Sequence, residues 1–296
     1  MIAAAELPAP AADAVPGRRR FIALLATPAT LAGGLIVALV VICALFAPWL
    51  APHDPNAQNL AEAAKPPAWL GGSTAYLLGT DHLGRDILSR TIWGARVAAI
   101  VGFSVVLIGC SIGVSLGMIA GYVGGLLDDL IARVADVQLA FPFILLAIAV
   151  VGVLGPSLWT VILTLGVTSW VQYVRIVRAE TLSLRDRDFV QAAIAGGASR
   201  ARILMRHILP NIASPITVLA TFEVARTVIL ESALSYLGLG VPATVPTWGT
   251  MLADGRQYLD TAWWMGTFPG LAVSLTVLGI NLFGDGLRDA LDPRSR

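Results

Sequence analysis

The side chains that usually carry chemistry in proteins are sparse in this sequence. Its three histidines are far apart and are not part of a spaced carboxylate–histidine set. Lys65 is the only lysine and lies in the segment AKPPAW, so the chain has no G-x-x-x-x-G-K-[ST] phosphate-binding loop. We therefore expect no catalytic residue, no metal and no cofactor in this chain, and any ATP hydrolysis linked to it must belong to a partner.

Three ionisable residues, Glu223, Arg226 and Glu231, lie inside an apolar stretch at roughly 212–234. A single charge at membrane depth costs about 2.5–3.5 kcal/mol on insertion scales and rarely faces lipid. Glu223 and Arg226 are three residues apart, so on one helix they can neutralise each other. Two interpretations stay open. The residues form a structural ion pair inside a bundle, or their helix face lines the path of a polar solute.

A polar, arginine-rich stretch, FVQAAIAGGASRARILMRHILP, runs from Phe189 to Pro210 between two apolar runs. Residues 175–206 contain seven arginines against three acidic residues, a net charge of +4. Arg-rich loops are retained on the cytoplasmic side. The alanines followed by Gly196-Gly197 predict a short helix, a sharp turn and a second helix from Ser199. Such a loop either meets anionic headgroups or docks on another protein.

This stretch resembles the EAA loop of ABC importer permeases, which has Glu-Ala-Ala, three residues, Gly, and then about ten residues before Leu-Pro. Gln191 replaces the acidic residue and cannot form its charge pair, and His207 stands where a branched apolar residue is common. The resemblance implies contact with a partner ATPase through a set of eight residues. These are Gln191, Ala192, Ala193, Gly196, Gly197, Arg200, Leu209 and Pro210.

Three further segments resemble the C-type permeases of dipeptide and oligopeptide importers. They are GTDHLGRDILSR at 79–90, the D-x-x-x-A-F-P pattern at 136–142 and GDGLRDALDP at 284–293. In the first segment, Asp86 and Arg90 are four residues apart on a predicted interfacial helix, so we expect a local ion pair. The resemblance covers roughly residues 30–294.

The composition is that of a polytopic membrane protein. It is 56% hydrophobic and 13% charged, against about 25% charged residues in soluble domains. Apolar runs long enough to span a bilayer occur at 31–50, 97–120, 134–154, 158–177, 212–234 and 265–283.

The second run contains a small-residue stripe, Gly109-x-x-x-Gly113-x-x-x-Gly117, suited to close helix packing. Pro142 predicts a kink in the third. Cys43 and Cys110 lie within apolar runs, as unreactive thiols do.

The distribution of basic residues predicts the topology. Six spans place fourteen arginines inside, at 18–20, 133, 175–206, 288, 294 and 296, and five basic residues outside, at 65, 85, 90, 96 and 256. This asymmetry follows the positive-inside rule and puts both termini in the cytoplasm. We expect a cytoplasmic tail at 1–27, a first transmembrane helix at 28–50, an external segment at 51–96, a five-helix core at 97–290 with a coupling loop at 179–209, and a tail at 291–296.

Together the resemblances imply an all-α integral membrane protein with six transmembrane helices and the type I ABC importer (MetI-like) permease fold. They imply a bacterial inner-membrane peptide permease that pairs with a homologous permease, two ATPases that hold ATP and magnesium, and an external solute-binding protein. Very similar permeases serve nickel, glutathione and other small solutes. A secondary transporter, which would carry broken helices in matched halves, and a structural membrane scaffold are the alternatives from other classes.

Overall fold

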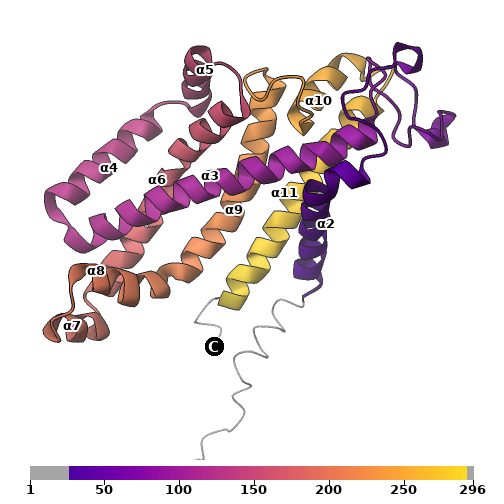
Figure 1. Ribbon diagram of the computed structural model, residues 1–296. Helices are drawn as coiled ribbons and strands as arrows, with labels where there is room; N and C mark the ends of the chain where they lie inside the picture. The colour runs from indigo at the N-terminus through magenta and orange to yellow at the C-terminus, as the bar shows by residue number, and fades with distance from the viewer. Residues whose placement is uncertain (1–26, 292–296) are drawn as a thin grey trace, which may run out of the picture.

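A computed structural model describes residues 27–291, and every regular element within that range is helical (Figure 1). The predicted tails at 1–27 and 291–296 lie outside the described residues except for residues 27 and 291, and Arg18–Arg20, Arg294 and Arg296 lie outside them too. The α-helices are α2 (Pro28–Leu50), α3 (Ile87–Val123), α4 (Gly125–Ala140), α5 (Phe143–Leu154), α6 (Leu158–Arg185), α7 (Asp188–Ala195), α8 (Arg200–Ile203), α9 (Leu209–Tyr236), α10 (Trp248–Gly255) and α11 (Trp264–Leu291).

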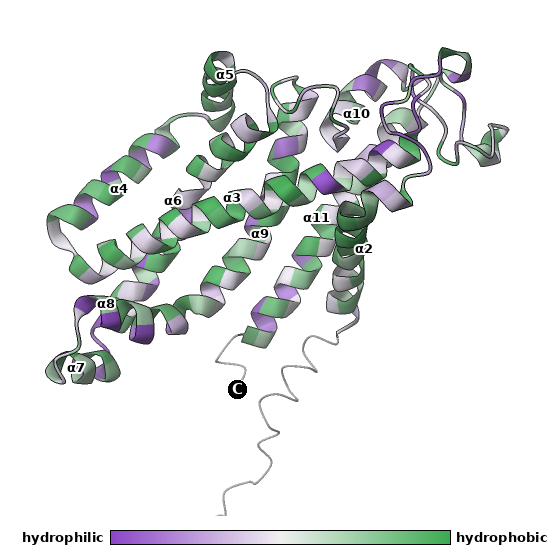
Figure 2. Cartoon of the chain, viewed as in Figure 1, coloured by the Kyte–Doolittle hydropathy of each residue, from purple (hydrophilic) through white to green (hydrophobic). Residues whose placement is uncertain are grey.

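Six spans result if the bent pair α4–α5 counts as one, in agreement with the prediction. Five helical runs are individually long and apolar enough to cross a membrane: α2, α3, α6, the run at 200–236 and α11. Figure 2 shows apolar residues along these helices, with hydrophilic residues concentrated near α8 and in the segment that precedes α3 and others on α4, α9 and α11.

The glycine stripe of α3 packs directly against α6, as its spacing predicts. A Cβ atom added at Gly113 would lie 2.4 Å from the Tyr173 Cβ and 2.5 Å from the Trp170 carbonyl oxygen. One added at Gly117 would lie 2.8 Å from the Val177 Cβ. The two helix backbones are therefore closer than any larger residue would allow.

The third span differs from the prediction of one helix with a kink. Residues 125–154 form two helices bent by 86° at the Ala140–Phe143 break. Phe141 is extended (φ −89°, ψ 127°) because a residue before proline is excluded from the helical region, and Pro142 then precedes the first turn of α5. The turn that precedes α4 lies at Gly124 and Gly125, both with positive φ.

The start of the fifth span also differs. The second helix of the basic stretch continues through a π-helical turn at 204–208 into α9, which begins at Leu209, three residues before the predicted span. The π turn shifts the hydrogen-bond register just before Pro210, which has no N–H to donate. One helical run thus connects the basic stretch to residue 236.

The helices place two groups of polar residues at opposite ends of the bundle (Figure 1). One end carries α7, α8, the first turn of α2 and the last turn of α11. The other carries α5, α10 and the segment at 51–86. This is the arrangement that six alternating crossings require.

Candidate functional site

The basic stretch forms a helix–turn–helix protrusion at one end of the molecule. Three backbone hydrogen bonds close the turn. The N–H groups of Gly196, Gly197 and Ala198 donate to the carbonyls of Ala192 (2.9 Å), Ile194 (2.9 Å) and Ala193 (3.0 Å), respectively. Gly197 has φ +76°, a left-handed conformation that side chains disfavour. The Ser199 hydroxyl then caps α8, as the sequence predicts.

One face of α7 anchors the protrusion and the other is exposed. Val190 is fully buried and packs in a cluster with Val177, Ile203 and Ile208 from α6, α8 and the π turn. Gln191, Ala192, Ile194 and Ala195 are exposed, and Ala193 is half-buried. Short alanine side chains on a free helix face let the surface of another protein approach closely. The exposed face is therefore built for contact and the buried face for attachment.

The eight residues predicted to couple to an ATPase fall into two groups. Gln191, Ala192, Gly196, Gly197 and Arg200 are exposed, and Ala193 is half-buried on the same protrusion. The other two lie on the continuous helix: Leu209 packs at the edge of the Val190 cluster, and Pro210 occupies the first turn of α9. Leu209 thus supports the protrusion rather than presenting its surface.

A hollow of about 380 Å³ lies beside α7. It is lined by Tyr122 and Val123 at the end of α3 and by Arg185, Asp186, Gln191, Ile194 and Arg200. The Gln191 side-chain amide donates to the Arg185 carbonyl (3.1 Å), and Arg185 and Arg200 line the same hollow as this neutral side chain. An acid at this position would have cationic neighbours within its own chain.

Of the three charged residues of α9, Glu223 and Arg226 are in contact and Glu231 lies apart from them. Arg226 Nη1 is 3.1 Å from Glu223 Oε1, the ion pair that the spacing of three predicts. Glu231 is buried and accepts a hydrogen bond from the Ser235 hydroxyl (2.7 Å). In the part of the chain that the structure describes, Glu231 has no basic partner. Glu223 and Glu231 point into the bundle, and of the three only the Arg226 side chain is exposed.

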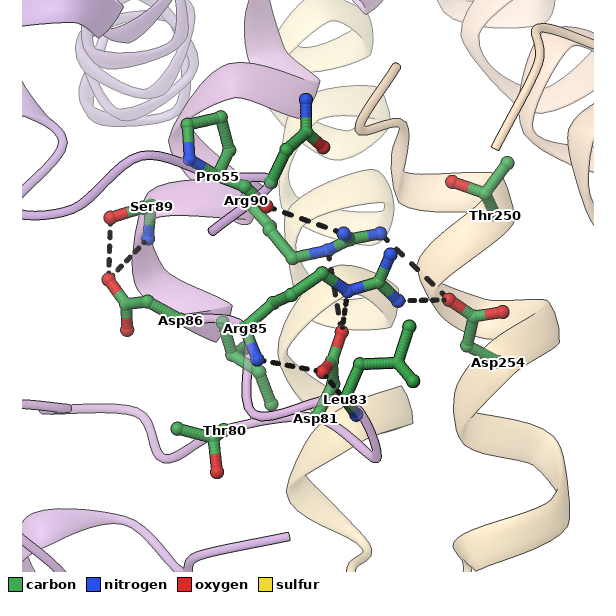
Figure 3. Close-up of polar contacts among 12 residues, drawn as sticks. Pro55, Thr80, Asp81, Leu83, Arg85, Asp86, Ser89, Arg90, Thr250 and Asp254 are labelled. Carbon is green, nitrogen blue, oxygen red and sulfur yellow. Dashed lines mark hydrogen bonds and ion pairs between the residues drawn. The ribbon is translucent and has the colours of Figure 1, made fainter. Parts of the chain in front are cut away.

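A buried ion cluster at the opposite end was not predicted. Figure 3 shows Asp81, Arg85, Arg90 and Asp254 in contact across three elements. Arg85 Nε lies 2.5 Å from Asp81 Oδ2, and its Nη2 lies 3.0 Å from Asp254 Oδ2 on α10. Arg90, which is 1% exposed, lies 3.8 Å from Asp81 and 3.9 Å from Asp254, and it donates to the Pro55 carbonyl.

The predicted Asp86–Arg90 ion pair is wrong. Asp86 is the N-cap of α3 and its Oδ2 accepts from the Ser89 amide (3.1 Å) and hydroxyl (2.5 Å). A cap of this kind fixes the helix start, so α3 begins at Ile87, ten residues before the predicted span. Arg90 points away from its cap and into the ion cluster. The alternation of acidic residues and arginines at 81–90 indicates that ion pairs form in this segment, but it does not specify which residues pair.

Asp81 and Asp254 lie close to His82, and one ligand atom from each of the three falls within 4.8 Å of the others. Both carboxylates already bind Arg85, and Arg90 adds a second positive charge. That charge opposes a metal ion, so we assign the cluster a structural role. Two indole N–H groups reinforce it: Trp264 donates to the Thr80 carbonyl (3.1 Å) and Trp248 to that of Thr91 (2.9 Å).

Comparisons with known proteins agree on one family. Residues 113–296 match the sequence profile of the binding-protein-dependent transport system inner membrane component, and residues 16–67 match that of the N-terminal TM domain of oligopeptide transport permease C. The chain is 46% identical over 265 residues to the di/tripeptide transport system permease protein DppC of Pseudomonas aeruginosa, covering 89% of this chain and 88% of that protein. It is 46% identical over 263 residues to the dipeptide transport system permease protein DppC of Escherichia coli K12, covering 88% of each.

A solved structure shares the fold. The chain aligns with the MetNI methionine ABC transporter in an inward-facing conformation with a TM-score of 0.56 and 20% identity, covering 70% of this chain and 98% of that one. At that identity the likeness concerns the arrangement of helices alone. It agrees with the all-helical ABC importer permease fold that the motifs imply.

Proposed function

The chain belongs to the family of binding-protein-dependent transport system inner membrane components, and we propose that it carries di- and oligopeptides across the cytoplasmic membrane as the permease subunit of an ATP-driven importer. Membership of this family implies an ATPase and a solute-binding protein as partners. The peptide substrate is inferred from its relatives, which include dipeptide and di/tripeptide permeases.

The observation that carries the proposal is the protrusion built from α7 and its glycine turn. It exposes Gln191, Ala192 and Ile194 while Val190 fixes it to α6 and the run into α9. A displacement of α7 therefore reaches two membrane helices directly. Closure of an ATPase pair would move α7, and the helices would change between outward- and inward-facing arrangements. Such coupling requires different contacts in the two states.

The finer assembly is part of the same proposal. We assign the chain to a heterodimer with a homologous permease, two ATPase subunits that hold ATP and magnesium, and one external binding protein. We place the second permease against the α4–α5 pair, where the described residues leave Leu126 (89% exposed) and Val153 (84% exposed) uncovered. The subunit itself contributes no catalytic residue to this scheme.

The proposed orientation has both termini and α7 in the cytoplasm and α10 outside. The arginines around α7 support it by the positive-inside rule, since Arg185, Arg187, Arg200, Arg202 and Arg206 all lie at the α7 end of the bundle. The segment at 51–86 and α10 then face the binding protein. Glu223, Arg226 and Glu231 remain the residues that we propose for the wall of the solute path.

Co-purification and transport test the proposal together. The tagged chain, expressed with its neighbouring transport subunits, should bring down ATPase subunits and a second permease. In proteoliposomes the complex should take up dipeptide only with ATP and the binding protein present. ATP-independent uptake driven by an ion gradient would favour a secondary transporter, and a complex without any ATPase would refute the assignment.

A further inference from the structure

A groove of about 460 Å³ opens between α6, α9 and α11 on the side of the bundle that carries α7. Its floor comes from α9, with Pro215, Val218, Leu219 and Phe222. α6 and α11 both pack on α9, so they form the two walls of the groove. This volume lies within the range of about 300–1,000 Å³ that small-molecule sites occupy.

The two walls carry opposite charges. Glu180 stands on the α6 wall and Arg288 on the α11 wall. Among the described residues neither side chain has an ion pair or a side-chain hydrogen bond. Within the part of the chain that the structure describes, the groove therefore presents an unpaired carboxylate and an unpaired guanidinium across an apolar floor that contains the Phe222 ring.

Asn211 and Ser214, near the start of α9, add further polar groups to the lining of the groove. Pro215 lies inside α9 and has no N–H, so the Asn211 carbonyl loses its usual helical donor. The Asn211 side-chain amide donates to the His207 carbonyl (2.6 Å), which leaves its own oxygen as an acceptor. The Ser214 hydroxyl donates to the Leu291 carbonyl (3.3 Å) and ties α9 to α11 beside the groove.

We propose that this groove is a cytoplasmic-side binding site for a zwitterionic short peptide, with the peptide ammonium at Glu180 and the peptide carboxylate at Arg288. A ligand with one charge would leave the opposite wall unpaired, whereas a free dipeptide offers both charges and an apolar side chain for the floor. Arg pairs with a carboxylate through two parallel hydrogen bonds, which favours a free C-terminus over an amidated one. This inference rests on the proposed function and names a site for its substrate.

The groove also has a place in the transport cycle. α9 and α11 are tied together by Ser214 and Leu291, while α6 continues toward α7. A displacement of α7 that moves α6 would change the distance between Glu180 and Arg288. Peptide bound between them would be held in one state and released in the other.

The test is binding of radiolabelled alanyl-phenylalanine to the complex of permeases and ATPases in phosphatidylcholine nanodiscs without the binding protein. Three probes are compared: the free dipeptide, its N-acetyl form and its C-amide. Glu180→Gln and Arg288→Gln are the test variants. Arg133→Gln is the matched control, because Arg133 is exposed on α4 and lies outside the groove.

Each capped peptide should bind at least about tenfold more weakly than the free dipeptide, since a charged hydrogen bond is lost. Glu180→Gln and Arg288→Gln should each weaken binding of the free dipeptide to a similar extent. N-acetylation should then matter less in Glu180→Gln, and C-amidation should matter less in Arg288→Gln. Arg133→Gln should leave the affinity for all three probes unchanged. Equal affinity of the wild-type complex for all three probes would overturn the proposal, whatever the variants show. Loss of binding in phosphatidylethanolamine nanodiscs would instead assign the groove to a lipid headgroup. Uptake that persists in the wild-type complex while peptide fails to bind the groove would reject this site and leave the proposed function standing.

Discussion

The turn at Gly197 offers a sharp test of the coupling role of α7. Gly197 has φ +76° and no atom within 4 Å of an added Cβ, so a substitution there is opposed by backbone conformation alone. A left-handed conformation costs most L-residues about 1–2 kcal/mol. That cost corresponds to about a 5- to 30-fold loss in the population of the native turn.

The strain should be relieved locally. α7 is fixed by the buried Val190 and by the half-buried Ala193 and Ala198, so the turn can rearrange while the membrane bundle stays folded. The adjacent Gly196 provides a matched control, because its φ is −76° and an added Cβ would meet the Ala192 and Ala193 carbonyl oxygens at ordinary distances of 3.4 and 3.5 Å. A rearranged turn would misplace the face that we expect to contact the ATPase.

The assay is ATP-driven dipeptide uptake by the reconstituted complex, with ATP hydrolysis measured in parallel. Gly197→Val should lower uptake at least about fivefold and lower the peptide carried per ATP, because a β-branched residue is a strong outlier at positive φ. Gly197→Asn should stay within about twofold of wild type, since asparagine tolerates the left-handed region, and so should Gly196→Ala. A Gly197→Val complex that assembles fully and transports like Gly196→Ala would refute the reasoning.

Three further predictions concern structure. Arg85→Ala removes the nearest partner of the buried Asp81 carboxylate and should destabilise the purified complex by about 3–5 kcal/mol; an unchanged melting temperature would contradict the role of the ion cluster. Gly84→Ala places a Cβ 1.8 Å from the Asn59 carbonyl oxygen at φ +73°, so the segment before α3 should become sensitive to protease, and equal resistance would refute this. Asp128→Asn disrupts the two hydrogen bonds between Asp128 and Arg178 of α6, so it should lower the free energy of unfolding by about 1–3 kcal/mol. Asp136→Asn disrupts the exposed ion pair with Arg175, so it should lower the free energy of unfolding by less than about 1 kcal/mol. Equal shifts in melting temperature for these last two variants would contradict the distinction.

Features set by local spacing could be predicted from the sequence. The Glu223–Arg226 pair follows from a separation of three residues on one helix, and the close packing of α3 against a neighbouring helix follows from the Gly109–Gly117 stripe, which does not specify α6 as that neighbour. The left-handed turn at Gly197 follows from a glycine pair after an alanine helix. Each of these depends on neighbours within two or three helical turns.

Features set by tertiary contacts could not be predicted. Arg85 and Asp254 are 169 residues apart, and nothing in either segment alone indicates that they meet. Hydropathy identifies the part of a helix that lies in lipid, so it missed the first ten residues of α3, where the polar Ser89 and Arg90 are buried by protein. Pro142 indicates a break, but the 86° bend depends on how α4 and α5 pack on α6.

Site-specific photo-crosslinking can show whether the exposed face of α7 contacts an ATPase. A photoreactive amino acid at Ala192, which is exposed on α7, should form an adduct with the ATPase subunit in the assembled complex. The same group at Leu60, which is 72% exposed at the opposite end, should form none. An Ala192 probe that never reaches the ATPase, or a Leu60 probe that does, would contradict the account.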